Sequence, residues 1–268
     1  MSLTKRLDDA REAYKKKDLA ASAEAHSSKA IIEGADEEHG GKGSQYIGSI
    51  VYGGLDGVVT TFAAVSGVAG AALGPNIILI MGLANLLADG FSMAVGSYLS
   101  DKSEQEYYNR EEEREAWEVD HFPEGEKQEL VTIYKSQGYS PEDAGNMTKT
   151  IAKDKRRWVD AMMLLELGLI RDDKKPITGA LATFAAFVIA GVIPLIVYLI
   201  GLVVPIPGNL AFTISAILSG VTLFGLGAAK VKVTGLNPLR SGLEMLLVGG
   251  AAAGVAYLVG MALKGLGA

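Results

Sequence analysis

Five long apolar stretches restrict the folds open to this chain more than any other feature. They occupy roughly residues 46–72, 76–99, 177–203, 208–229 and 242–263. About 20 mostly apolar residues are needed to cross a hydrocarbon core roughly 30 Å thick. Helices that are this long and apolar on all faces are rare inside a soluble domain of 268 residues. The sequence therefore predicts an all-α membrane protein with five transmembrane helices.

The charged residues lie outside these stretches. Hydrophobic residues make up 49% of the chain and the formal net charge is −6, but acids and bases crowd into residues 1–45 and 100–175. This segregation is typical of a membrane protein with soluble appendages. It predicts an N-terminal cytoplasmic segment with a hinge, transmembrane helices 1 and 2, a helical cytoplasmic insert, and transmembrane helices 3 to 5. Their predicted ranges are 1–45, 46–100, 101–175 and 176–268.

The distribution of lysine and arginine predicts how the chain crosses the membrane. The connections near residues 73–76 and 203–209 carry no charge, whereas the insert and the connection 230–241 are rich in bases. Because cytoplasmic loops carry the excess of bases, the N-terminus and the insert are expected in the cytoplasm and the C-terminus outside. The short chain shows no targeting extension, which favours a prokaryotic plasma membrane over a vacuolar one.

Several classes of function are disfavoured by what the sequence does not contain. There is no cysteine, which excludes disulfides and thiolate metal sites. No P-loop, catalytic triad or H-E-x-x-H pattern occurs, and the acidic chain has no basic footprint for nucleic acid. We therefore expect neither an enzyme nor a nucleic-acid-binding protein, and no resident cofactor.

Two aspartates interrupt the first two apolar stretches. Asp56 stands about ten residues into the first, and Asp89 about ten residues before the cytoplasmic end of the second, which places both roughly 15 Å from that face. Met93 follows Asp89 by four residues and shares its helix face. Two carboxylates and a thioether would suit a soft divalent metal such as Fe²⁺. Alternatively, the aspartates bond to nearby polar groups as structural links, and Met93 fills space.

The insert begins with a dense run of acids. Residues 101–129 contain twelve acids and four bases. The second apolar stretch is predicted to continue as a helix to about Asp120, where the sequence HFPEG breaks it before a new helix near Glu126. If the chain folds back, Glu115 and Glu118 face Glu126 and Glu129, and a multivalent cation would relieve their repulsion. The alternative is an ordinary solvated acidic face.

Two further helices are predicted in the insert. One begins at Ser140 with Pro141 in its first turn, and the other runs from about Ile151 to Leu167. On the latter, Met162, Met163 and Glu166 share a face and either extend the metal site or belong to the core. The N-terminal segment is predicted to be one amphipathic helix over residues 3–34, followed by the hinge GGKGS.

Glycines recur at four-residue spacing in the apolar stretches, as at Gly53 and Gly57 or Gly250 and Gly254. Such pairs let two helices approach closely. The spacing fits packing inside one bundle as well as a seam between two copies.

These residues together resemble the vacuolar iron transporter family. The first stretch reads GGLDGVVTTFAAVSGVAGA, the second LANLLADGFSMAVGSYLSDKSEQEYY, and the insert contains EEEREAWEV. The resemblance covers roughly residues 46–265. It implies a homodimer in the lipid bilayer that exports Fe²⁺, with Mn²⁺ and Zn²⁺ as further divalent metals, in exchange for protons.

The resemblance also implies roles for individual residues. Asp56 and Met93 become ligands of the membrane path, and the insert becomes a metal-collecting site. The residues of that site are Glu115, Glu118, Glu126, Glu129, Met162, Met163 and Glu166. The chain departs from some eukaryotic members, which carry acids where Gln45 and Asn85 stand here, and Asp89 is the candidate substitute in the proton route. A metal-regulated scaffold or sensor that binds metal without transporting it is the alternative function.

Overall fold

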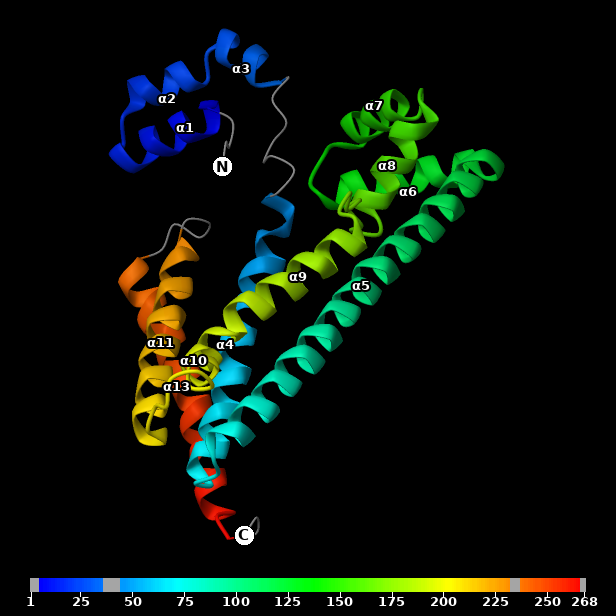
Figure 1. The fold of residues 1–268 in the computed structure, drawn as a ribbon. Helices are drawn as coiled ribbons and strands as arrows, with labels where there is room; N and C mark the ends of the chain where they lie inside the picture. Colours follow the sequence, from blue (N-terminus) through cyan, green and yellow to red (C-terminus); the bar gives the residue numbers. More distant parts are fainter. Residues whose placement is uncertain (1–4, 36–43, 232–236, 266–268) are drawn as a thin grey trace. The chain divides into compact units, whose positions relative to one another are not determined.

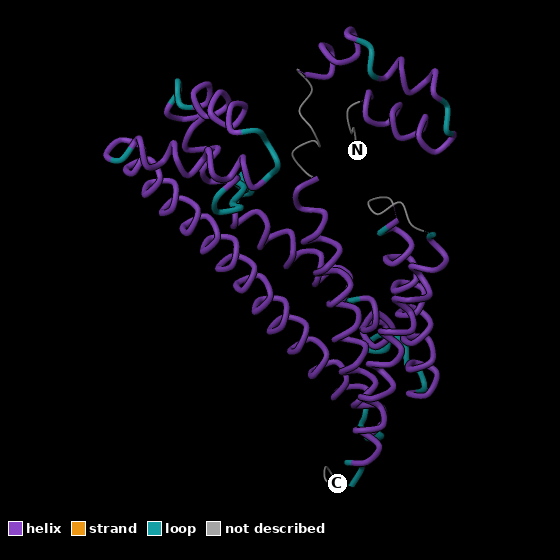
Figure 2. The backbone as a smooth tube through the Cα atoms, turned by 180° about the vertical axis from the view of Figure 1, so that it is seen from behind, coloured by secondary structure: helices purple, strands orange, loops and turns teal. Residues whose placement is uncertain are grey.

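The computed structural model describes residues 5–35, 44–231 and 237–265, and every regular element within these ranges is a helix (Figures 1 and 2). The chain divides into two compact units. The first unit comprises residues 1–94 and 179–268, and the second unit comprises residues 95–178. The all-helical fold class is therefore confirmed for the described residues.

Five helical segments are long and apolar enough to cross a membrane. They are α4 (Ile47–Gly70), α5 (Pro75–His121), the segment Pro176–Ile200, α11 (Gly208–Ala229) and α13 (Pro238–Ala262). This count confirms the five predicted stretches. Helix α5 continues without a break into the acidic insert, as predicted, and only its first half, to about residue 99, is apolar.

The third of these segments contains a break that the sequence prediction did not include. It consists of α9 (Pro176–Gly191), the short 3₁₀ helix η2 (Ile193–Leu195) and α10 (Ile196–Ile200). Pro194 causes the break, because a proline ring has no N–H and clashes with the preceding turn. The Ser215 hydroxyl of α11 donates to the Pro194 carbonyl oxygen at 2.6 Å. A neighbouring helix thus satisfies a backbone group that hydrocarbon could not.

Glycines let α4 pack against two other helices at backbone distance. A Cβ at Gly57 would lie 2.3 Å from the backbone oxygen of Phe187 on α9. A Cβ at Gly260 on α13 would lie 1.9 Å from the backbone oxygen of Gly67 on α4. The spacing at Gly53 and Gly57 therefore serves packing inside one bundle.

Replacing Gly260 by alanine should destabilise the protein strongly. The added methyl group would overlap a backbone atom that cannot move aside, which costs roughly 1 to 3 kcal/mol or more. Gly250→Ala on the same helix is the matched control, because no atom lies within 4 Å of its Cβ position. Thermal stability in detergent, followed by size-exclusion chromatography of heated samples, should fall for Gly260→Ala and not for Gly250→Ala. Equal stability of the two variants would contradict the close helix contact.

The second unit contains the last part of α5 together with α6 (Pro123–Ser136), α7 (Pro141–Ile151) and α8 (Lys155–Leu165). Ser140 caps α7 as predicted, its hydroxyl oxygen accepting from the Asp143 N–H at 3.1 Å. The predicted start of the fourth helix at Ile151 is wrong. Asp154 accepts from the Arg157 N–H at 2.9 Å and so begins α8 there.

The N-terminal segment is not the single helix predicted for residues 3–34. It consists of α1 (Lys5–Lys16), α2 (Leu19–Ala25) and α3 (Ser28–Ala35). Lys17 has a φ of 54°, which ends α1, and the Asp18 side chain accepts from two N–H groups to begin α2. Most of the hinge GGKGS lies outside the described residues.

Candidate functional site

Three glutamates of the second unit lie together where α5 turns into α6. Glu115 and Glu118 stand three residues apart on one face of α5, and Glu126 lies in the first turn of α6. Pro123 occupies the first turn of α6 and lets the chain reverse after α5 ends at His121. One carboxylate oxygen from each of the three lies within 4.8 Å of the other two. We refer to Glu115, Glu118 and Glu126 as the glutamate cluster.

The glutamate cluster is buried to a degree that is unusual for carboxylates. Glu115 is 0% exposed and Glu126 is 6% exposed. Within the described residues, the Oε2 atoms of both have no hydrogen-bond partner. Buried carboxylate oxygens normally have partners, and each one left unpaired is destabilising by roughly 1 to 3 kcal/mol. A cation between the three carboxylates would supply the missing interactions.

Burial and mutual repulsion both disfavour ionisation of the cluster. Burial, followed by the charge of Glu166, raises the pKa of Glu115 to about 7. Burial, followed by the charges of Glu115 and Glu129, raises the pKa of Glu126 to about 7. A bound divalent ion would reverse this effect, because it favours the ionised form of every ligand.

Arg114 partly neutralises the glutamate cluster from the protein itself. Its guanidinium forms ion pairs with Glu115 and Glu118, and with Glu111 at 3.0 Å. These contacts, above all the hydrogen bonds to Glu111, raise the pKa of Arg114. The sequence prediction counted Arg114 only as one of four bases, because spacing along a helix does not show which acids a flexible side chain reaches.

Glu129 and Glu166 lie at the exposed edge of the glutamate cluster rather than within it. Burial, and then the charge of Glu129, raises the pKa of Glu166. Met162 and Met163 are 0% and 1% exposed and belong to the hydrophobic core of the second unit. Packing alone accounts for their burial, so a ligand role for either sulfur stays a prediction.

Stability of the metal-free protein should fall as the pH rises through about 7. The folded-state pKa of Glu115 and Glu126 lies above the ordinary value of 4.5, so the folded protein holds protons that the unfolded chain has released. This contribution is complete below pH 4.5 and lost above about 7, and each pKa unit corresponds to about 1.4 kcal/mol. We expect a lower melting temperature at pH 8 than at pH 5.5 in the presence of a chelator. Equal values would contradict the pKa shifts.

The two intramembrane aspartates lie near each other in the first unit. Asp56 on α4 and Asp89 on α5 are both partly buried, and their charges repel each other. The Thr60 hydroxyl donates to the backbone oxygen of Asp56 at 2.8 Å, and no contact within the described ranges pairs either carboxylate with a donor. The structural-link alternative therefore gains no support. Met93 packs at the edge of the hydrophobic core.

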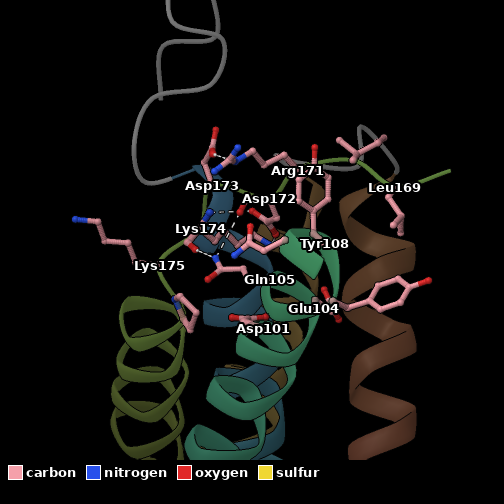
Figure 3. Close-up of a pocket in the computed structure, with 14 residues that line it drawn as sticks. Asp101, Glu104, Gln105, Tyr108, Leu169, Arg171, Asp172, Asp173, Lys174 and Lys175 are labelled. Carbon is pink, nitrogen blue, oxygen red and sulfur yellow. Dashed lines mark hydrogen bonds and ion pairs between the residues drawn. The ribbon is translucent and has the colours of Figure 1, made fainter. Parts of the chain in front are cut away.

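A cavity of about 520 Å³ elsewhere in the second unit lies between α5 and the segment from α8 to α9 (Figure 3). The Gln105 Nε2 atom donates to the backbone oxygen of Lys174 at 2.5 Å. Arg171 pairs with Glu112 at 3.5 Å, and its guanidinium lies 5.9 Å from the centre of the Tyr108 ring. These contacts fasten the segment to one face of α5. No periodic pattern in the sequence indicated them, since the segment is not helical.

Comparisons with known proteins agree on one family. The model of the VIT family matches residues 47–261. A Toxoplasma gondii protein named vacuolar iron transporter is 40% identical over 268 residues, covering 96% of this chain and 88% of the relative. A Plasmodium falciparum protein of the same name is 33% identical, covering 98% of each chain. Vacuolar iron transporter 1 of Arabidopsis thaliana is 33% identical, covering 85% and 89%. These names refer to the vacuole and do not favour the expected prokaryotic plasma membrane.

Proposed function

The chain belongs to the VIT family, and from that premise we propose that it transports iron, moving Fe²⁺ out of the cytoplasm in exchange for protons. The family resemblance identified in the sequence is thereby confirmed. Relatives named vacuolar iron transporter and five helices able to cross a membrane support an integral, multi-pass transporter. Mn²⁺ and Zn²⁺ are the further ions that the same ligands would accept.

The observation that carries this proposal is the buried glutamate cluster with its unpaired oxygens. In the proposal, Glu115, Glu118 and Glu126 collect the ion on the cytoplasmic side. Carboxylate oxygens bind divalent cations without selecting strongly among them, so softer donors would have to sharpen the preference for Fe²⁺. Glu129 and Glu166 at the edge would attract ions, and Met162 or Met163 would contribute only if a sulfur turned toward the cluster.

The membrane path in this proposal begins at Asp56 and Met93. An ion in a low-dielectric region needs a fixed negative charge, and a carboxylate with no hydrogen-bond partner is free to supply it. Asp89 lies near Asp56, so the pair would bind one divalent ion or take up protons in its place. Protons and metal compete for the same carboxylate oxygens, which gives exchange a physical basis.

The proposal also includes a homodimer with the N-terminus in the cytoplasm, as the family resemblance implies. Mass photometry of the detergent-solubilised protein distinguishes a dimer from a monomer.

Metal flux into sealed vesicles tests the proposed function. Purified protein in proteoliposomes should pass Fe²⁺ and, with a pH-sensitive dye on the far side, show protons moving in the opposite direction. Competition by Mn²⁺ and Zn²⁺ ranks the ions. Binding of Fe²⁺ without any flux would refute the transporter and favour the metal-regulated scaffold or sensor.

A further inference from the structure

A cavity of about 400 Å³ lies in the first unit, where two membrane helices begin. Its wall includes Asn76 at the start of α5, Tyr198 on α10, and Pro207 and Ala211 at the start of α11. No side chain in the wall carries a charge. The cavity therefore differs from the glutamate cluster and lies apart from the carboxylates of the proposed ion path in sequence and in chemistry.

The Tyr198 side chain is the unexplained group in this cavity. It is 2% exposed, and its hydroxyl has no hydrogen-bond partner within the ranges that the structure describes. Buried tyrosine hydroxyls normally have a partner, and one without a partner is destabilising. The hydroxyl is a good donor, so an acceptor from outside the chain would complete the site.

Two helix N-termini add further donors at the same place. The first N–H groups of a helix have no acceptor within it, and the positive end of the helix dipole favours a negatively charged partner. The N-cap of α11 is Pro207, which offers no side-chain hydrogen bond. Helix α5 begins at Pro75, next to Asn76 in the cavity wall. Donors from three elements thus surround a space that contains no carboxylate.

We propose that this cavity binds the phosphate of a membrane phospholipid from the leaflet in which α5 and α11 begin. The Tyr198 hydroxyl donates to a phosphate oxygen, and the helix N-termini stabilise its charge. Exposed apolar side chains beside the cavity offer a surface for the acyl chains: Ile77, Ile80 and Leu202 are 40%, 67% and 66% exposed. Free inorganic phosphate offers the same oxygens but gains nothing from that apolar surface, and no lysine or arginine in the wall attracts it from water.

Delipidated protein in detergent tests the proposal with three probes that share parts of the ligand: dioleoyl phosphatidylcholine, dioleoylglycerol and inorganic phosphate. Native mass spectrometry should show one tightly held phosphatidylcholine per chain, and the same lipid should raise the melting temperature. Dioleoylglycerol and phosphate should do neither. Protection by dioleoylglycerol equal to that by the phospholipid would overturn recognition of the phosphate, and protection by phosphate alone would overturn the lipid as its source.

Tyr198→Phe separates binding from a merely structural role. Loss of one hydrogen bond should weaken phosphatidylcholine binding about fivefold. Without lipid the variant should be at least as stable as the wild type, because it removes an unpaired hydroxyl. Tyr257→Phe, at a partly exposed tyrosine on α13, is the matched control and should bind the lipid normally. Unchanged lipid affinity in Tyr198→Phe, or a loss of stability without lipid, would overturn the assignment.

Discussion

Asp56→Asn should reduce Fe²⁺ flux in proteoliposomes about 100-fold, to the background of empty vesicles. The substitution keeps the shape of the side chain and removes its charge. In a medium of low dielectric constant, one carboxylate near a divalent ion contributes several kcal/mol, and 2.7 kcal/mol already corresponds to 100-fold. Asp89→Asn should have a smaller effect on flux but alter the number of protons exchanged, because Asp56 remains as a ligand.

The variant must still fold and bind metal for this result to be informative. Glu244→Gln is the matched control, since Glu244 is an exposed carboxylate on a membrane helix and is expected to leave flux unchanged. Metal binding by the second unit, followed through the fluorescence of Trp117 and Trp158, should be the same in all three proteins. Wild-type flux from Asp56→Asn would remove Asp56 from the path, and loss of metal binding would indicate a folding defect instead.

The membrane helices were predictable because their signal is long and redundant. Each stretch contains about 20 apolar residues, so a single exception such as Asp56 or Asp89 does not hide it. The continuation of α5 as far as His121 was predictable as well, because helix-forming glutamates extend the helix until Pro123 stops it. Patterns of this kind depend only on residues that are neighbours along the chain.

Features that depend on one residue were missed. Lys17 adopts a positive φ that few non-glycine residues adopt, so the break in the N-terminal segment left no mark in its periodicity. Pro194 was visible in the sequence, but its effect depended on whether another helix would satisfy the freed carbonyl oxygen. Ser215 does so from 21 residues away. Such partners are set by how helices pack, and one sequence does not contain that information directly.

The candidate site shows the same division. Spacing alone places Glu115 and Glu118 on one face of α5, and the turn at Pro123 predicts that α6 folds back. The structure adds which carboxylates converge: Glu126 joins the glutamate cluster, whereas Glu129 stays at its edge. Side-chain burial and the reach of Arg114 decided this outcome, and neither follows from helical periodicity.

Glu115→Gln should have two opposite effects, a loss of metal binding and a gain in the stability of the metal-free protein. Removing one of three carboxylates should weaken Fe²⁺ or Mn²⁺ binding by at least about 100-fold, because it withdraws a ligand and a full negative charge. Without metal, the amide ends the repulsion with Glu118 and Glu126 and supplies a donor to their oxygens. The expected gain at pH 8 is roughly 1 to 3 kcal/mol. At pH 5 the gain should nearly vanish, since Glu115 is then protonated in the folded protein.

This pair of signs distinguishes a metal site from a structural carboxylate. If Arg114 and Glu115 formed a stabilising ion pair and nothing more, Glu115→Gln would leave a charged partner behind and lower the melting temperature at every pH above 5. Glu113→Gln is the matched control, because Glu113 is exposed on the same helix and should change neither property. Isothermal titration with Mn²⁺ and melting curves with a chelator measure both effects on one preparation. A destabilised variant that still binds Mn²⁺ with wild-type affinity would show that the unpaired oxygens of the glutamate cluster are not waiting for a cation.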